Sequence, residues 1–284
     1  MHDTRLVSWS MMVETTMHIQ AHAKVNMSLF VGELLEGGLH PIESKMARIA
    51  LCDELDVTRL ENHALSRYAV FWNENAPKQS EIDWPVVSDL AVKAHRLLES
   101  NIGHPLPVQM KLEKRIPVGG GLGGGSADAA AMLQATVALF DLDVDLFKIA
   151  EELGSDVPYL VHGGSAKVRG VGTVVEPFEQ ERQYIVLAIP EYGCSTAEVY
   201  NAFDTLETVE SNKQQNNLLC AACAVEPKLE TDMASLTSLL EQEIYLSGSG
   251  STMFAICDNA EHATAVAKKI KEHSNLVAVA TQTC

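Results

Sequence analysis

The segment IPVGGGLGGGSADAA, residues 116–130, has the residue types and spacing of a phosphate-binding loop. Six of the seven residues from Gly119 to Gly125 are glycine, and an alanine-rich run follows directly. Glycine is costly to order, so such a cluster indicates that the backbone itself has a task. Backbone N–H groups that lead into a helix N-terminus favour an anion, because the amides and the helix dipole act together. We therefore expect this loop to hold a phosphate.

Three familiar glycine-rich motifs match the loop less well. Gly119, Gly121 and Gly124 satisfy the dinucleotide-binding pattern G-x-G-x-x-G, but that fold requires the next helix to lead into a buried strand. Here a second helical pattern, DLDVDLFKIAEELG, follows instead. A Walker A loop needs a lysine after the glycines, and a protein kinase needs HRD and DFG motifs; neither is present. A flexible loop, or close packing against another backbone, remains the structural alternative.

The elements that must position this loop follow from periodicity. Alternation over residues 18–31 predicts a half-buried strand, with Lys24 and Asn26 on its polar face. Ser126 is the expected N-cap of the helix that follows the glycines. Further strands are predicted at 47–58, 67–72 and 107–116, and further helices after Pro85 and over 143–153, the latter ending before Gly154.

The character of the chain changes near residue 184. YIVLAIP is a continuous apolar strand, and STAE at 195–198 is a capping box that opens a helix. Helices near 216–225 and 230–242, a strand, the turn LSGSGS, a second strand, a helix over 260–272 and a last strand complete the pattern. Two α+β lobes that meet near residue 175 are the simplest organisation.

Composition narrows the class of partner. The 284 residues are 46% hydrophobic and 21% charged, which predicts an ordinary packed core. A net charge of −17 argues against nucleic acid and anionic membranes as partners, because both require a basic surface. An anionic substrate must therefore be held by local positive groups. No apolar run is long enough to predict a membrane span.

The N-terminus and the cysteines favour a cytoplasmic protein. MHDTRLVSWSMMVETTMHIQ lacks the apolar stretch of a signal peptide, and residues 1–16 could be an extension. The six cysteines are scattered, as in a reduced compartment. Cys220 and Cys223 form a CxxC without a second pair, which favours a buried alanine-rich helix over zinc. The oligomeric state stays open between monomer and homodimer.

With its flanking residues, the glycine loop resembles the ATP-binding loop of the GHMP kinases, whose pattern is roughly P-x-x-x-G-L-G-S-S-A-A. Three further segments are similar to that family: AHAKVNMSLFV at 21–31, GSDVPYLVHGGSAKVRGVG at 154–172 and LSGSGSTMFAI at 246–256. The segments occur in the family's order. The doubled glycine triplets are most similar to the member that phosphorylates 4-diphosphocytidyl-2-C-methyl-D-erythritol.

The resemblance implies an α+β, two-domain GHMP kinase fold. An N-terminal ATP-binding and catalytic domain, like domain 2 of ribosomal protein S5, would span residues 17–176. A ferredoxin-like α+β C-terminal domain would span residues 177–284. The implied reaction uses ATP and Mg²⁺ to phosphorylate the 2-hydroxyl of 4-diphosphocytidyl-2-C-methyl-D-erythritol, in the non-mevalonate pathway to isoprenoid precursors.

The resemblance also implies a catalytic base, Asp156, and its partner, Lys24. The pattern agrees, because Lys24 and Asn26 are two residues apart on one strand face and Asp156 follows the Gly154 helix stop, where a carboxylate should be exposed. Phosphoryl transfer mainly requires positioning, charge neutralisation and a carboxylate that accepts the hydroxyl proton. Without the resemblance, the aspartate would be interpreted as a helix cap and the lysine as solvated.

Other site residues are implied in the same way. Lys114 would lie near the adenine, and Ser126 would be the hydroxyl nearest the phosphates and a candidate Mg²⁺ contact. Asn26 would contact the substrate, His40 would help to recognise its cytosine, and Tyr200 would stack on that base. The residues implied to bind ATP are Lys114, Pro117, Gly119, Gly120, Gly121, Leu122, Gly123, Gly124, Gly125 and Ser126. The structural alternatives are a solvated strand lysine for Lys114 and a core aromatic for Tyr200.

Two departures from the family pattern affect base recognition. Leu39 stands where the family has a tyrosine before the histidine, and Asp89 stands where it has an asparagine. These changes motivate one alternative, a GHMP kinase that acts on another small-molecule alcohol. A second alternative is a non-catalytic binding protein with the same fold, although the retained Lys24, Asp156 and glycine loop argue against it.

Overall fold

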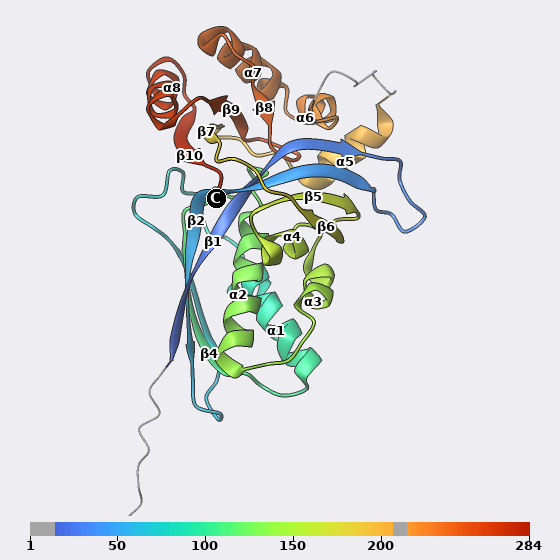
Figure 1. The fold of residues 1–284 in the computed structure, drawn as a ribbon, viewed down its shortest axis with the longest axis vertical. Coiled ribbons are helices and arrows are strands. Elements are labelled where there is room, and N and C mark those ends of the chain that lie inside the picture. Colours follow the sequence, from blue (N-terminus) through green and yellow to red (C-terminus); the bar gives the residue numbers. More distant parts are fainter. Residues whose placement is uncertain (1–14, 207–214) are drawn as a thin grey trace, which may run out of the picture.

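Two sheets with their covering helices make up the part of the chain that the computed structural model describes, residues 15–206 and 215–284 (Figure 1). The strands are β1 (Thr16–Val31), β2 (Ile42–Arg59), β3 (Arg67–Trp72), β4 (Val108–Lys114), β5 (Ser165–Gly170), β6 (Val174–Pro177), β7 (Tyr184–Ile189), β8 (Tyr245–Leu246), β9 (Met253–Cys257) and β10 (Val277–Gln282). The helices are α1 (Leu90–Ile102), α2 (Gly124–Phe140), α3 (Leu146–Leu153), α4 (Val157–His162), α5 (Thr196–Thr205), α6 (Leu219–Val225), α7 (Pro227–Leu240) and α8 (Ala260–His273), with a 3₁₀ turn at Val86–Ser88. The expectations for residues 1–14 lie outside the described residues.

The first lobe is built on a six-stranded sheet with the order β3-β4-β2-β5-β6, and β1 pairs with β2. Helices α1 and α2 pack side by side against this sheet (Figure 1). Val108, Met110 and Leu112 alternate into the core from β4, as the period-2 pattern predicts. Helix α2 is buried on most of its surface, and its alanines let both the sheet and α1 approach closely. The strands predicted at 18–31, 47–58, 67–72 and 107–116 are confirmed.

The junction between the glycine loop and α2 differs from the prediction. Ser126 is not the N-cap; it is the third residue of a helix that begins at Gly124. Gly123 occupies the cap position with φ 69° and ψ 22°, and no side chain caps the helix. The positive φ of Gly123 turns the chain into the helix three residues early, so the first backbone N–H groups have no intrahelical or side-chain acceptor. Helix α3 follows α2 with no strand between them, which confirms the argument against a dinucleotide-binding fold.

The segment after α3 was only partly predicted. Helix α3 ends at Leu153, directly before Gly154, as expected. Asp156 then occupies the N-cap position of α4, although its side chain makes no capping hydrogen bond. Periodicity did not reveal α4, β5 or β6, because elements of four to six residues are too short to show a period.

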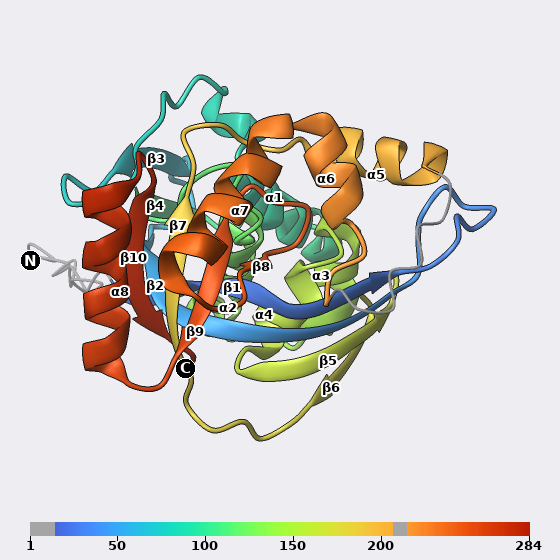
Figure 2. The same ribbon diagram turned by 90° about the horizontal axis from the view of Figure 1, so that it is seen from above.

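The second lobe contains an antiparallel sheet with the order β10-β7-β9-β8. Figure 2 shows α8 alongside the strands of this sheet, where it contacts β10 and β7; α7 lies next to α8, and α6 packs against α7 and α5. Ser195 caps α5 by accepting a hydrogen bond from the Glu198 backbone N–H, so the predicted capping residue is confirmed. Strand β7 is apolar throughout because both of its faces are buried: Val186 packs into the second lobe, whereas Ile185 faces the first.

A hydrophobic cluster joins the lobes. It unites Val25 and Ile49 of the first lobe with Leu187 and Phe254 of the second. Leu29, near the end of β1, packs in the core of the second lobe and bridges to Asn216. The simple two-lobe division near residue 175 therefore understates how far β1 extends, and the domain limits 17–176 and 177–284 stay predictions. Within the described ranges, no helix is long and apolar enough to cross a membrane.

Candidate active site

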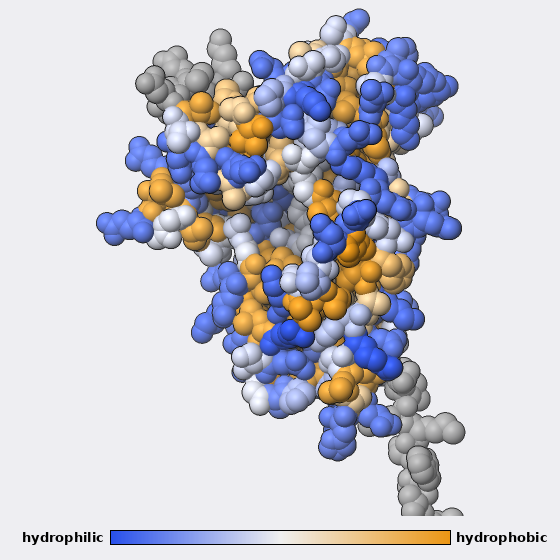
Figure 3. All heavy atoms as spheres, turned by 180° about the vertical axis from the view of Figure 1, so that it is seen from behind, coloured by the Kyte–Doolittle hydropathy of each residue, from blue (hydrophilic) through white to orange (hydrophobic). Residues whose placement is uncertain are grey.

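A cavity of about 1070 Å³ lies where the two lobes meet. Seen from behind, the surface is hollowed between the lobes (Figure 3). All residues that the sequence suggested for the site line this one cavity, although they come from separate parts of the chain: β1, the loop between β1 and β2, β4, the glycine loop, α2, the start of α4 and α5. They are Lys24, Asn26, His40, Lys114, Pro117, Gly119, Gly120, Gly121, Leu122, Gly123, Gly124, Gly125, Ser126, Asp156 and Tyr200.

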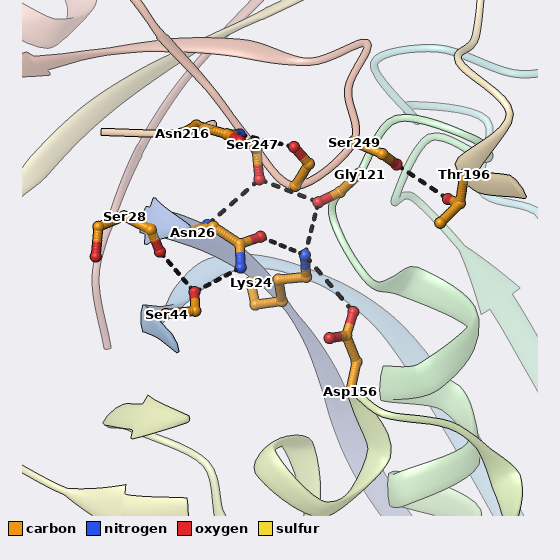
Figure 4. A network of polar contacts seen from close by, with 11 residues as sticks. Lys24, Asn26, Ser28, Ser44, Gly121, Asp156, Thr196, Asn216, Ser247 and Ser249 are labelled. Carbon is orange, nitrogen blue, oxygen red and sulfur yellow. Dashed lines mark hydrogen bonds and ion pairs between the residues drawn. The ribbon is translucent and has the colours of Figure 1, made fainter. Parts of the chain in front are cut away.

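Lys24 and Asp156 form an ion pair at the cavity wall, with 3.6 Å between Lys24 Nζ and Asp156 Oδ2 (Figure 4). The lysine side chain is 5% exposed and the aspartate 27% exposed. The Asp156 carboxylate is therefore half-buried rather than freely exposed, and it lines the cavity together with Lys24. A carboxylate beside a buried ammonium can accept a proton from a substrate hydroxyl while the ammonium balances its charge.

The Lys24 ammonium group also has two neutral acceptors. It donates to Asn26 Oδ1 at 2.6 Å and to the Gly121 carbonyl oxygen at 3.0 Å. The Lys24 backbone N–H donates to the Leu122 carbonyl, so β1 and the glycine loop are joined at this residue. An ammonium group has three N–H donors, and two of them are held in fixed directions. The third is left for Asp156 or for an anion in the cavity.

The glycine loop packs directly against the Gly/Ser turn of the second lobe. Ser247 Oγ donates to the Gly121 carbonyl at 3.0 Å, and the Thr252 backbone N–H donates to the Gly120 carbonyl. A Cβ atom on Gly121 would overlap the Ser247 carbonyl oxygen, so a side chain is excluded there. Close packing against another backbone therefore explains Gly121, whereas a Cβ on Gly120 would meet the Thr252 side-chain hydroxyl at 2.7 Å.

Other glycines of the loop have different neighbours. A Cβ on Gly123 would meet Lys24 Cγ at 3.0 Å and Lys24 Cε at 3.1 Å. Around Gly119 a Cβ would meet no atom within 4 Å, and around Gly125 it would meet only Leu90 at 4.0 Å. Gly119 and Gly125 are thus the glycines whose open side a ligand could occupy. The phosphate site stays a prediction that these positions and the uncapped α2 N-terminus support.

Lys114 is buried, in contrast to the solvated lysine of the structural alternative. Its ammonium lies 2.6 Å from Asp53 Oδ2 and 2.6 Å from Asp128 Oδ2. The second oxygen of Asp53 accepts hydrogen bonds from the backbone N–H groups of Arg115 and Ile116. The second oxygen of Asp128 has no hydrogen-bond partner among the described residues. This buried cluster forms the wall of the cavity behind the start of α2.

The cluster changes the proton affinity of its members. Burial opposes the charged form of Lys114, but the carboxylates of Asp128 and Asp53 outweigh it and raise the pKa of Lys114. Burial raises the pKa of Asp128 well above the usual carboxyl range; the Lys114 ammonium opposes this shift, and the Asp53 charge adds to it. One ammonium between two buried carboxylates leaves an excess negative charge, and Asp128 is the carboxylate with fewer hydrogen bonds.

His40 and Tyr200 lie together in the wall of the same cavity, with their ring centroids 5.4 Å apart. His40 Nδ1 lies 2.8 Å from the Gly32 carbonyl oxygen, and His40 Nε2 lies 3.3 Å from Asp204 Oδ1. Burial raises the pKa of Tyr200 to about 12, with a further contribution from the charge of Asp156. The phenol is therefore neutral at physiological pH. An aromatic and an imidazole side by side can receive the flat face of a base.

The two departures from the family pattern also line the cavity. Leu39 is 58% exposed, so an aliphatic side chain borders the base end. The Asp89 carboxylate is already hydrogen-bonded to nearby residues: it accepts from the Ala91 backbone N–H and from Trp84 Nε1. Asp89 thus caps α1 at the edge of the cavity.

Sequence reasoning missed several residues of the site. Asp128 lies inside the quoted loop motif but looks like an ordinary helix residue, and Asp53 lies 61 residues before its lysine partner. Ser247 belongs to the quoted LSGSGS turn, yet nothing in the pattern shows that it touches the glycine loop. Asp204 could have been found, since it follows Tyr200 by one helical turn on α5.

Comparison with known proteins agrees on one family. The model of the GHMP kinases N terminal domain matches residues 89–164. The chain is 31% identical to the 4-diphosphocytidyl-2-C-methyl-D-erythritol kinase of Exiguobacterium sibiricum, over 93% of this chain and 97% of that protein. It is 32% identical to the enzyme of the same name from Thermus thermophilus, over 88% and 91%. A crystal structure of 4-(cytidine 5'-diphospho)-2C-methyl-D-erythritol kinase matches with a TM-score of 0.76 and 30% identity, over 94% of this chain and 99% of that one.

The contact between Gly123 and Lys24 generates a first prediction. Gly123→Ala places a methyl group against the lysine stem and displaces its ammonium from Asp156, so we expect kcat to fall at least about tenfold. Gly103→Ala is the matched control for backbone strain, because Gly103 has a φ of 82° and open space around it. Gly103 caps the C-terminal end of α1 and does not line the cavity. Both variants should lose about 1–2 kcal/mol of unfolding free energy, which is the cost of a left-handed alanine. Equal kcat in the two variants would contradict the steric argument.

The buried cluster generates a second prediction, measured by chemical denaturation. Asp128→Asn should raise the free energy of unfolding at pH 7 by about 1 kcal/mol, because it removes the excess buried charge. Asp53→Asn should lower it by about 3 kcal/mol, because that carboxylate is fully hydrogen-bonded.

The effect of Asp128→Asn on the free energy of unfolding should depend on pH. Because the folded-state pKa of Asp128 lies above the unfolded value of about 3.9, its contribution to the free energy of unfolding falls as pH rises from that value towards the folded-state pKa. Asp128→Asn should therefore differ little from wild type at pH 4 and be more stable at pH 7. A variant that is less stable than wild type at pH 7 and equal to it at pH 4 would show that the charged carboxylate is needed.

Proposed function

The chain belongs to the family of 4-diphosphocytidyl-2-C-methyl-D-erythritol kinases among the GHMP kinases, and we propose that it transfers the γ-phosphoryl group of ATP to the 2-hydroxyl of that diphosphocytidyl compound. The predicted family and the α+β GHMP kinase fold are confirmed. The kinase family implies ATP as the co-substrate. The observation that carries the proposal is the Lys24–Asp156 pair, which lies at the cavity wall beside the glycine loop.

In the proposed reaction, the hydroxyl oxygen of the substrate attacks the γ-phosphorus of ATP while the Asp156 carboxylate accepts the hydroxyl proton. The bond between the γ-phosphorus and the bridging oxygen of ADP breaks, and ADP leaves. Proton acceptance requires a carboxylate that reaches the cavity, and Asp156 is partly exposed there. Lys24 faces the same space from β1, held by Asn26 and Gly121. Its remaining N–H can contact Asp156 or the transferring phosphoryl oxygens, where a fixed positive charge lowers the barrier.

The glycine loop and the start of α2 would hold the ATP phosphates. Helix α2 begins without a side-chain cap, so its first backbone N–H groups are available to an anion. Gly119 and Gly125 leave open space beside the backbone. With a net charge of −17, the chain cannot attract ATP by its overall field, so these local donors and Lys24 must supply the attraction.

The base end of the cavity would hold the cytosine of the acceptor. Tyr200 and His40 lie together there, and Leu39 borders them. We propose that Tyr200 stacks on the cytosine and that His40 contacts its edge. Leu39 supplies an aliphatic rather than an aromatic second face, so the stacking energy on that side is smaller than with a tyrosine.

The site is compatible with a Mg²⁺ ion that has few protein ligands. Within residues 15–206 and 215–284, no three His, Cys, Asp or Glu side chains gather as a metal site. Mg²⁺ commonly takes only one or two protein ligands, and phosphates and waters complete its shell. The Ser126 hydroxyl, in the first turn of α2 at the cavity wall, would be a protein ligand. The bound ion would neutralise charge on the phosphates.

A cytoplasmic location, a monomeric or homodimeric state and the absence of nucleic-acid or membrane partners stay predictions.

The proposed base assignment is tested by Asp156→Asn. With ATP, Mg²⁺ and the diphosphocytidyl acceptor, wild-type protein should release ADP, and the variant should lose about 10²–10⁴-fold in kcat. ATP affinity, measured by calorimetry, should stay within about twofold, because the carboxylate contacts Lys24 and, among the described residues, makes no hydrogen bond with the glycine loop. Mevalonate and homoserine serve as acceptor controls and should support no turnover.

Each failure of this assay has a distinct meaning. Near-normal turnover by Asp156→Asn would remove Asp156 as the base. Turnover of another alcohol alone would keep the kinase and change the substrate. ATP binding by wild type without turnover of any acceptor would favour a non-catalytic binding protein.

A further inference from the structure

We propose that Ser44 is a positioning residue for Lys24 and acts through Asn26. Ser44 lies on β2, across from the lysine strand, and makes no contact with Lys24 itself (Figure 4). Asn26 Nδ2 donates to Ser44 Oγ at 2.8 Å, and Ser44 Oγ donates to the Ser28 carbonyl oxygen at 2.6 Å. A chain of hydrogen bonds therefore runs from a backbone carbonyl to the Lys24 ammonium.

The direction of every bond in this chain is fixed. The Ser28 carbonyl can only accept, so it takes the single proton of the Ser44 hydroxyl. Ser44 Oγ must then accept from Asn26, and the amide must present Nδ2 to it. An ammonium group can only donate, so the amide atom that faces Lys24 must be Oδ1. The two ends independently require the same amide orientation.

Burial makes this orientation matter. Ser44 and Asn26 are both buried, and the side chain of Lys24 is 5% exposed. If the amide were reversed, its NH₂ group would face the ammonium, and two donors would meet without water to separate them. Ser44 therefore selects the one amide orientation that anchors the ammonium beside Asp156.

The same contacts revise the role predicted for Asn26. The side-chain oxygen of Asn26 is held by Lys24 and its nitrogen by Ser44, so both polar atoms already have partners within the protein. Ser44 is absent from the cavity wall among the described residues, although Asn26 and Lys24 belong to it. We therefore assign Asn26 to the support of Lys24 and place Ser44 behind it.

The kinetic test rests on the proposed phosphoryl transfer. Ser44→Ala removes the acceptor for Nδ2 and leaves the Asn26 side chain held at one end only, by Lys24, so the ammonium is less firmly positioned and kcat should fall about tenfold, the equivalent of one hydrogen bond. The KM values for ATP and for the acceptor should stay within about twofold, because the serine does not line the cavity. A rise in either KM with unchanged kcat would contradict a role through Lys24.

Ser28→Ala is the matched control. It removes a serine hydroxyl from the same neighbourhood but keeps the backbone carbonyl that Ser44 uses. Within the described part of the chain, the one hydrogen bond of Ser28 Oγ is the one it accepts from the Lys45 backbone N–H. Its kcat should equal that of wild type. If Ser28→Ala and Ser44→Ala lose the same activity, the effect belongs to the local packing of β1 on β2, and the proposal fails.

A double-mutant cycle separates action through Asn26 from a general structural role. If Ser44 acts through Asn26, adding Ser44→Ala to Asn26→Ala should leave kcat unchanged within about twofold. Multiplication of the two losses would show that the residues act independently and would overturn the proposal.

A substrate-free measurement keeps this test apart from the proposed function. In protein labelled with ¹⁵N-asparagine, the side-chain amide signal that Asn26→Ala removes belongs to Asn26. That amide should exchange with water at least about tenfold faster in Ser44→Ala than in wild type or Ser28→Ala, because its hydrogen bond is lost. Equal exchange in all three proteins would refute the proposal, whichever acceptor the enzyme phosphorylates. Absence of turnover by wild type, with the expected exchange pattern, would refute only the proposed reaction.

Discussion

A buried ammonium group is stable only when every direction around it offers an acceptor, and the arrangement of this site follows from that requirement at Lys24. The acceptors come from three separate parts of the chain: Asn26 on the same strand, the Gly121 carbonyl in the glycine loop and the Asp156 carboxylate at the start of α4. Because these parts must converge on one nitrogen atom, the lysine fixes how β1, the loop and α4 pack.

The two buried lysines show how the choice of acceptor sets what a charge can do. Lys114 lies between Asp53 and Asp128, so its charge is already balanced and two of its N–H donors are held by carboxylates. Lys24 has two neutral acceptors and one carboxylate at 3.6 Å, which is longer than a hydrogen bond. Lys114 is therefore suited to a structural role in the wall of the cavity. The positive charge of Lys24 is less completely neutralised, so it could still attract an anionic group such as a phosphoryl group.

Sequence patterns predicted the long elements and the glycine loop, and the resemblance to the GHMP kinases supplied the other residues that line the cavity. Neither predicted the contacts inside the cavity. The alternation around Lys24 and the glycine run were visible because each depends on residues close in sequence. The Asp53 pairing and the contact between Gly121 and Ser247 were not, since they join residues 61 and 126 positions apart. The expected cap at Ser126 was wrong because propensity favours serine at that position, whereas the left-handed Gly123 starts the helix earlier.

The glycine loop contacts both Ser247 of the second lobe and Lys24 of the first, so the packing of the two lobes affects the position of Lys24. Gly121 has no room for a side chain because the Ser247 carbonyl of the second lobe occupies that space, and its own carbonyl accepts from Ser247 and Lys24 together. Ser247 Oγ donates its proton to Gly121 and accepts from the Asn26 backbone N–H, so it links the loop to β1. A change in lobe packing would therefore move the carbonyl that holds Lys24. The second lobe supplies Tyr200 to the cavity wall and Ser247 to the glycine loop, so the cavity is built from both lobes.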